Sequence, residues 1–362
     1  MISYKYKLYT THRTKYLDRM LREAAFVWNH ALALQKRYYA LFGRYISCVD
    51  MQKHFRKRIR RNLLGSQTVQ ELLQRQDAAY KRFFKHLAKR PPKFRKAKDF
   101  KSIVYKTSCY RFWGNEVIIN RKYRFKFSYS RPWEGDVKRI IFKRTPLGEY
   151  YLIIVTNAVA YPVRKSHDGA SVGIDFGLKT YMTLSDGSFV RNPRFLKENL
   201  KELKRRSHNL SKCKKGSHNR ERKRKELNRL YEKITNCRDD WQWALARDLC
   251  REFDYIYIED LNLLGMSKLW GQKMSDLGHA EFIKKLEHIA KKYGVTVHKI
   301  DRFYASSKTC TCGHVNKDLK LSDRKWICPI CGAVHDRDYL AANNILRQGI
   351  VELKREARPA SA

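Results

Sequence analysis

Four cysteines near the C-terminal end of the chain have the type and spacing of a metal site. They come in two pairs separated by a short polar loop: Cys310, Cys312, Cys328 and Cys331. Two such pairs suit a tetrahedral Zn²⁺ ion, which takes four sulfur ligands from two turns of chain. Because four sulfurs leave no open position on the ion, we expect the zinc to be structural and the neighbouring acidic residues to be the reactive ones.

Acidic residues occur at three places that a folded sheet would bring together. Asp175 and Glu259 each end an apolar strand, and Asp338 begins an alanine-rich helix directly after the cysteines. In α/β sheets, sites collect beyond the strand ends, so we expect these carboxylates to meet. A charge in an apolar run is costly unless it is needed there, although Asp175 taken alone could be a turn-capping residue.

A cluster of three carboxylates requires cations, because the groups otherwise repel one another and take up protons. Oxygen ligands suit Mg²⁺ or Mn²⁺. Two such ions side by side can activate a water molecule and stabilise the leaving oxygen in phosphodiester hydrolysis. Asp175, Glu259 and Asp338 are therefore predicted to bind magnesium or manganese.

The charge of the chain indicates a nucleic-acid partner. The 362 residues contain 78 Lys and Arg against 35 Asp and Glu, a formal net charge of +43. Self-repulsion of this size is tolerable when a polyanion neutralises it, and nucleic acid is the natural polyanion. Solubility or membrane-surface attraction is the weaker alternative, because the charge is spread over several segments.

One dense basic group is predicted to contact phosphates. It follows a break at residues 214–219 in the otherwise helical stretch 195–250, and its members are Arg220, Arg222, Lys223 and Arg224. A solvated helix face is the alternative, but the density of the cations favours phosphate contact.

Cysteine usage and the lack of apolar runs indicate the compartment. The other five cysteines lie far apart without a pairing pattern, which favours a reducing compartment over a disulfide framework. The N-terminal residues lack a signal-peptide core, and no apolar run approaches the roughly 20 residues of a membrane span. We therefore expect a cytoplasmic protein.

The N-terminal part of the chain is predicted to be a small β-barrel interrupted by helices. Residues 2–9 alternate as a strand does, apolar spacing predicts helices over 14–41 and 68–88, and a basic run occupies 51–63. Four further strands follow, at 117–120, 123–129, 137–144 and 149–157. Such barrels bind oligonucleotides on a basic, aromatic face. Five rings could supply that face, without commitment to any one of them: Tyr105, Tyr110, Trp113, Tyr123 and Phe125.

Four segments in the second half of the chain resemble a known family. They are GIDFGLKTYMTLSDG, YIYIEDLNLLGM, the cysteine segment from SSKTCTCG to WICPICG, and HDRDYLAANNIL. In order, over residues 171–347, they are similar to the C-terminal motifs of TnpB-type nucleases. These are RNA-guided endonucleases of the OrfB insertion-sequence family and relatives of type V CRISPR effectors. The likeness extends more weakly through RQDAAYKRFFK upstream.

The resemblance implies a multi-domain α/β fold. It implies a RuvC-like (RNase H-type) nuclease domain at 166–305 and 335–350, with a zinc ribbon at 306–334 inserted before the last acid. It also implies a wedge β-barrel at 1–10 and 100–165, interrupted by a helical recognition lobe at 11–99. The remainder, 351–362, is expected to be a tail.

The resemblance also implies an activity. Asp175, Glu259 and Asp338 take the first, second and third catalytic positions, with Asp336 as the competing choice for the third. A guide RNA would pair with double-stranded target DNA, and the protein would read only a short flanking motif. The enzyme would be a Mg²⁺-dependent (or Mn²⁺-dependent) DNA endonuclease of a mobile element, with structural Zn²⁺, in the bacterial cytosol at the nucleoid.

The chain departs from the family pattern at two places. The first cysteine pair encloses one residue, Thr311, instead of the usual two, so that His314 could substitute for one sulfur. Leu340 stands where the family usually has Asn.

Two other functions are compatible with the sequence. A nuclease-inactive, RNA-guided DNA-binding regulator would be marked by the loss of an acid, and none is lost. A strand-transferring transposase would share the RNase H-like fold, but that function does not account for a zinc ribbon immediately before the last acid.

Overall fold

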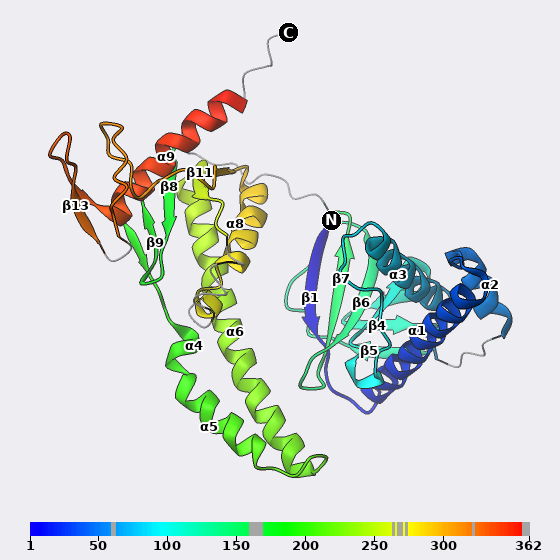
Figure 1. The fold of residues 1–362 in the computed structure, drawn as a ribbon. Helices are drawn as coiled ribbons and strands as arrows, with labels where there is room; N and C mark the ends of the chain where they lie inside the picture. The colour runs from blue at the N-terminus through cyan, green and yellow to red at the C-terminus, as the bar shows by residue number, and fades with distance from the viewer. Residues whose placement is uncertain are drawn as a thin grey trace, which may run out of the picture. The chain divides into compact units, whose positions relative to one another are not determined.

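The computed structural model describes residues 1–58, 63–158, 169–262, 265, 271, 274–320 and 323–356. The chain divides into an N-terminal unit, Met1–Val159, and a C-terminal unit, Ala160–Ala362 (Figure 1). The predicted domain boundary at 165/166, residues 59–62 of the basic run and the end of the tail lie outside the described residues. No helix in the described part of the chain is long and apolar enough to cross a membrane.

Two of the three described helices of the N-terminal unit, α1 (Thr14–Phe42) and α3 (Ser66–Phe84), follow the predicted apolar periodicity. α1 begins at the predicted residue, and α3 corresponds to the helix predicted over 68–88. α2 (Cys48–Arg58) contains most of the basic run, and short 3₁₀ turns lie at Ala97–Asp99 and Thr107–Cys109. α1 ends where Gly43 takes φ 63° and its amide donates to the Tyr39 carbonyl at 2.8 Å, as glycine favours after a helix.

The strands of the N-terminal unit form two antiparallel sheets. The first has the order β1-β7-β6-β2 and the second the order β3-β4-β5. Their bounds are β1 (Ile2–Lys7), β2 (Ser102–Lys106), β3 (Tyr110–Trp113), β4 (Glu116–Ile119), β5 (Tyr123–Lys126), β6 (Val137–Arg144) and β7 (Tyr150–Thr156). The N-terminal strand joins this sheet as predicted, since β1 pairs with β7. The described ladders link the two sheets through one bridge, Leu8 to Phe127, so a closed barrel stays a prediction.

The aromatic residues of these strands serve mainly as core. Tyr105, Tyr110 and Phe125 are buried with the inner faces of α1 and α3, whereas Trp113 is 78% exposed. Tyr123 is half-buried. Of the five rings proposed for a binding face, only Trp113 and Tyr123 therefore present substantial surface.

The C-terminal unit is built on one mixed sheet of order β10-β9-β8-β11-β12. Its strands are β8 (Ser171–Phe176), β9 (Thr180–Leu184), β10 (Phe189–Arg191), β11 (Tyr255–Glu259) and β12 (Thr296–Ile300). β8, β11 and β12 are parallel to one another, whereas β9 and β10 are antiparallel additions at the other edge.

The two faces of this sheet have different partners. Val172, Ile174 and Phe176 on β8 pack with apolar residues of α6 (His218–Glu252) and α8 (His279–Tyr293). The alternate residues face α9 (Arg337–Glu356), because side chains of a strand point to opposite faces in turn. Gly173 and Asp175 lie on this second face, which α9 crosses (Figure 1).

α9 lies unusually close to the sheet. A Cβ on Gly173 would lie 2.2 Å from the Ala342 carbonyl oxygen, and one on Gly349 would lie 2.1 Å from the Tyr257 ring. Tyr257 is the register partner of Gly173 across β8 and β11. The helix backbone therefore rests directly on the centre of the sheet, and glycine is required at both contacts.

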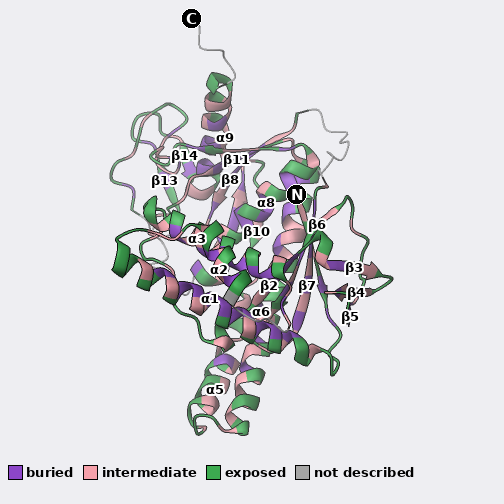
Figure 2. Cartoon of the chain, turned by 90° about the vertical axis from the view of Figure 1, so that its right-hand side faces the viewer, coloured by how far each residue is buried: buried purple, intermediate pink, exposed green. Residues whose placement is uncertain are grey.

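A helical hairpin extends from the sheet. α4 (Phe195–Glu198) and α5 (Leu200–Ser211) lead to α6, and the predicted break at 214–219 overlaps the turn between α5 and α6. Exposed and partly exposed residues dominate α5 (Figure 2). A small apolar core holds the hairpin together, formed by Leu203, Leu227, Leu230 and Ile234.

We predict that Gly173→Ala destabilises the protein by about 3 kcal/mol, at the upper end of ordinary overpacking, because the new methyl group meets helix backbone that cannot rotate away. The thermal midpoint measures this loss. Gly271→Ala is the matched control, since a Cβ there has no atom of the described residues within 4 Å. Equal midpoints for the two variants would contradict the close approach of α9.

Candidate active site and metal centre

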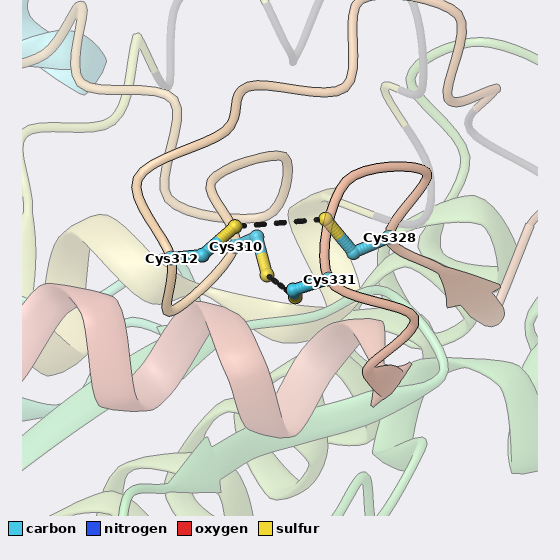
Figure 3. Close-up of side chains that lie close together, drawn as sticks. All are labelled: Cys310, Cys312, Cys328 and Cys331. Atoms are coloured by element: carbon cyan, nitrogen blue, oxygen red, sulfur yellow. Dashed lines mark hydrogen bonds between the residues drawn. The ribbon is translucent and has the colours of Figure 1, made fainter.

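The four cysteines gather as the spacing predicts. Among the described residues, they are the one group of three or more potential metal ligands, with ligand atoms all within 4.8 Å of one another. Figure 3 shows Cys310 and Cys312 on one loop facing Cys328 and Cys331 on another. The Sγ atoms of Cys310 and Cys331 are 3.5 Å apart, and those of Cys312 and Cys328 are 3.7 Å apart. Zn–S bonds of about 2.3 Å place tetrahedral sulfurs about 3.8 Å apart, so the set fits zinc.

A histidine that the sequence analysis missed adjoins this cluster. His335 is buried on β14 (Val334–Asp336), and its Nε2 lies 3.0 Å from the Cys310 Sγ. Burial raises the pKa of the Cys310 thiol, but hydrogen bonds from the Cys312 backbone and from His335 lower it to about 5. His314, the alternative ligand, instead accepts a hydrogen bond from the Cys310 amide through its carbonyl, at 2.8 Å.

Leu340 is explained by packing. Its side chain is 5% exposed and belongs to the same apolar cluster as Cys310, Cys328 and Trp326 of β13 (Lys325–Ile327). Leu340 therefore attaches α9 to the core of the cysteine segment (residues 306–334).

Asp175 and Glu259 are side by side at the ends of parallel strands. β8 and β11 run in register up to the pair Ile174 and Ile258, so the next residues of the two strands are Asp175 and Glu259. Neighbouring strands lie about 4.8 Å apart, and residues in register point to the same face. Two carboxylates thus project toward α9 from adjacent strands.

α9 brings Asp338 to the same end of the sheet. Asp338 lies four residues before Ala342, which touches Gly173, and four residues are about one helical turn. Asp336, the competing choice, has another role: its Oδ1 accepts the amides of Asp338 and Tyr339, both at 3.2 Å, and so caps the helix.

The charges of Glu259 and Asp338 both act on the carboxyl group of Asp175. Burial raises the pKa of Asp175 to about 8, with further contributions from the charges of Glu259 and then Asp338. Arg337 and Arg324 oppose this shift. Burial also raises the pKa of Glu259. Such a cluster favours either protons or a cation.

Two contacts position the second and third acids. Ser306, which is 6% exposed, donates a hydrogen bond to the Glu259 carboxylate. Arg324, just before β13, places its Nη1 2.9 Å from both oxygens of Asp338. The guanidinium supplies Asp338 with positive charge, as a metal ion would.

Buried Asn344 connects these contacts to the cysteine segment. Its Nδ2 donates to the carbonyls of Ser306 at 2.8 Å and Thr309 at 2.6 Å. These hydrogen bonds attach the residues just before the first cysteine pair to α9. They also keep Ser306 in contact with Glu259. The sequence contains no local signal for this role of Ser306, because its partner is 47 residues away.

The predicted phosphate-binding cations are largely engaged within their own hairpin. Arg220 donates to the carbonyls of Leu210 and Cys213 at 2.8 and 2.9 Å. Three more cations pair with glutamates three or four residues away on α6: Arg224 with Glu221, and Lys223 and Arg222 with Glu226. Their role in nucleic-acid binding stays a prediction.

Three family models match the chain. Residues 154–269 match an OrfB IS605-type model described as "Probable transposase", and residues 279–345 match "Cas12f1-like, TNB domain". Residues 1–44 match "Helix-turn-helix domain", although β1 and the single long helix α1 occupy that segment here.

Relatives and a solved structure align over most of the chain. A Streptomyces pristinaespiralis protein named "Putative RNA-guided DNA endonuclease" is 30% identical, over 96% of this chain and 89% of its own. The Escherichia coli (strain K12) protein "Putative RNA-guided DNA endonuclease InsQ" is 28% identical, over 92% and 88%. The fold is similar to a chain of "Cryo-EM structure of the Cas12f1-sgRNA-target DNA complex", with TM-score 0.56, 16% identity and coverage of 92% and 83%.

We predict that Asp175→Asn stabilises the Mg²⁺-free protein increasingly as the pH rises. The folded-state pKa of Asp175 is about 8, against about 3.9 in an unfolded chain, so the folded wild type holds the extra proton and loses stability from about pH 4 to pH 8. Asparagine does not titrate, and the gap in thermal midpoint should therefore widen from pH 5 to pH 8.

The matched control for this measurement is Asp248→Asn on exposed α6 surface. Its midpoint should differ from wild type by the same amount at both pH values. A gap for Asp175→Asn that is independent of pH would show that Asp175 is not desolvated beside other acids.

Proposed function

This chain belongs to the TnpB family of IS605 OrfB proteins, and from that membership we propose that it is an RNA-guided DNA endonuclease of a mobile element. Asp175, Glu259 and Asp338 would be its catalytic residues. The observation that supports this proposal most is the register of β8 and β11, because Asp175 and Glu259 directly follow its last paired residues, Ile174 and Ile258.

The donor set fits divalent magnesium or manganese. All three side chains offer carboxylate oxygen, the ligand that Mg²⁺ and Mn²⁺ prefer. Two such ions, when bound, supply the charge that activates water and stabilises the leaving oxygen in phosphodiester hydrolysis. In the protein itself, Ser306 orients Glu259, and Arg324 neutralises Asp338.

We assign a domain to each remaining part of the chain. The strand order of the C-terminal unit, with parallel β8, β11 and β12 and antiparallel β9 and β10, supports a RuvC-like (RNase H-type) nuclease domain. We assign residues 306–334 to a zinc ribbon whose four thiolates close a structural site. The wedge barrel (1–10 and 100–165) and helical lobe (11–99) would bind nucleic acid.

The proposed partners are a guide RNA and double-stranded target DNA. A net charge of +43 supports binding of both. The relatives are named as putative RNA-guided DNA endonucleases, and the similar Cas12f1 structure is titled as a complex with sgRNA and target DNA. Guide RNA and target DNA are therefore the first partners to test.

The test is to express the protein with its native flanking DNA, purify it, and sequence the RNA that accompanies it. We expect one abundant RNA with a constant scaffold and a variable end. With that RNA, the wild type should cut matching DNA in Mg²⁺, and Asp175→Ala should bind the RNA normally without cutting.

Three results would contradict the proposal. Heterogeneous RNA, or none, would exclude guided recognition. Cutting by Asp175→Ala at the wild-type rate would exclude the assigned site, whereas RNA binding without cutting by the wild type would favour the nuclease-inactive regulator.

Ser306→Ala should lower the cleavage rate about 10-fold and raise the Mg²⁺ concentration for half-maximal activity, as loss of a hydrogen bond to a metal ligand commonly does. Ser306→Thr keeps a hydroxyl and should recover most of the activity. Neighbouring Ser307→Ala is the control and should leave the Mg²⁺ dependence unchanged. A change in Ser306→Ala confined to thermal stability would contradict the positioning role.

A further inference from the structure

A hollow of about 500 Å³ opens in the N-terminal unit where the start of α1 meets β4 and β5. Its wall is aromatic, with Tyr16, Tyr123 and Phe125, and its rim is cationic, with Arg13, Lys122 and Arg124. The hollow lies outside the acidic site and outside the cysteine segment, and the proposed catalytic chemistry makes no use of it.

The aromatic wall offers ring surface to a ligand. Tyr16 is 36% exposed and Tyr123 is half-buried, while Phe125 is buried behind them. The rings of Tyr16 and Tyr123 have centroids 5.1 Å apart and planes tilted by 47°. Two partly exposed rings therefore stand together at the mouth of the hollow.

A second hollow of about 470 Å³ continues from the first. The two share His12 and Tyr16, and the second adds Lys15, Arg19 and Arg22 of α1. Its one acid, Asp18, is engaged elsewhere, since it accepts from Arg144 at 2.9 Å and from Tyr150 at 2.6 Å. The continuous surface, which we call the α1 groove, has a row of cations beside an aromatic mouth.

The cations of the α1 groove are uncompensated. Within the described part of the chain, six of them have no carboxylate within 4.0 Å: Arg13, Lys15, Arg19, Arg22, Lys122 and Arg124. Glu116 is the one acid of the first hollow. In the α6 hairpin, by contrast, glutamates already pair with Arg222, Lys223 and Arg224. An anionic ligand gains more from charges that are not yet neutralised.

We propose that the α1 groove binds single-stranded nucleic acid, with a base against Tyr16 and Tyr123 and flanking phosphates on Arg13, Lys122 and Arg124. An unpaired base is required, because a ring face within a hollow can stack only on a base that has left its duplex. The inference rests on the proposed function only in taking nucleic acid as the partner, and it does not depend on the acidic site.

The test uses the full chain, freed of nucleic acid in high salt, and a fluorescein-labelled 12-nucleotide single strand unrelated to any guide. Fluorescence anisotropy measures its affinity. Tyr16→Ala should weaken binding at least about 5-fold, since stacking on an aromatic ring contributes about 1–3 kcal/mol per base. Tyr16→Phe keeps the ring and should bind as the wild type does.

A matched control lies on the same helix. Tyr39 is 60% exposed and lines neither hollow, so Tyr39→Ala should leave the affinity within about twofold of wild type. Thermal midpoints of all the variants show whether a loss of binding reflects a loss of folding.

Salt dependence separates the phosphate contacts from the stacking. The paired change Arg13→Ala with Arg124→Ala should reduce the slope of log affinity against log salt by about 1.4, because each phosphate contact on a single strand contributes about 0.7. Tyr16→Ala should lower the affinity without altering that slope.

Equal single-strand affinity of folded Tyr16→Ala and wild type would overturn the inference, and so would an equal loss by Tyr16→Ala of affinity for a 12-base-pair duplex of the same sequence. If the wild type cuts guided DNA but these variants bind normally, this inference alone fails. If the wild type binds no nucleic acid, the proposed function fails with it.

Discussion

The contact between α9 and the centre of the sheet is the constraint on which the C-terminal unit depends. The backbone of α9 occupies the space that a side chain at position 173 would need. Only the hydrogen atom of glycine fits between the Gly173 Cα and the Ala342 carbonyl oxygen. Such a contact fixes both the depth and the register of the helix, because interiors are close-packed. Asp338, one turn away from Ala342, is placed against β8 as a consequence. The geometry of the third acid is thus set by a glycine.

The cysteine segment connects the surroundings of Glu259 to those of Asp338. It begins at Ser306, which bonds Glu259, and it leads into the helix that bears Asp338. Asn344 holds the entering chain on α9, and Leu340 is packed within the apolar cluster of the segment. A metal ion bound by the four thiolates would therefore stabilise the two cysteine loops and also the positions of Glu259 and Asp338.

Local patterns in the sequence were sufficient for most elements and for the cysteine cluster. Helix α1 from Thr14, the pairing of β1 with the later strands, and the four sulfurs all follow from periodicity or spacing. Roles that depend on distant contacts could not be predicted. The different roles of Asp336 and Asp338 follow from the helix cap that Asp336 forms, and the role of Ser306 follows from its contact with Glu259. The α1 groove joins residues about a hundred positions apart.

In the function that we propose, Asp175, Glu259 and Asp338 would together hold divalent metal. Anomalous diffraction from crystals soaked in Mn²⁺ tests it most directly, with data collected at the manganese and zinc edges. We predict manganese at Asp175, shared with Glu259 and Asp338, and zinc at the four cysteines. In Asp175→Ala crystals the manganese should be lost and the zinc retained. Zinc at the cysteines with no manganese at Asp175 would contradict the claim.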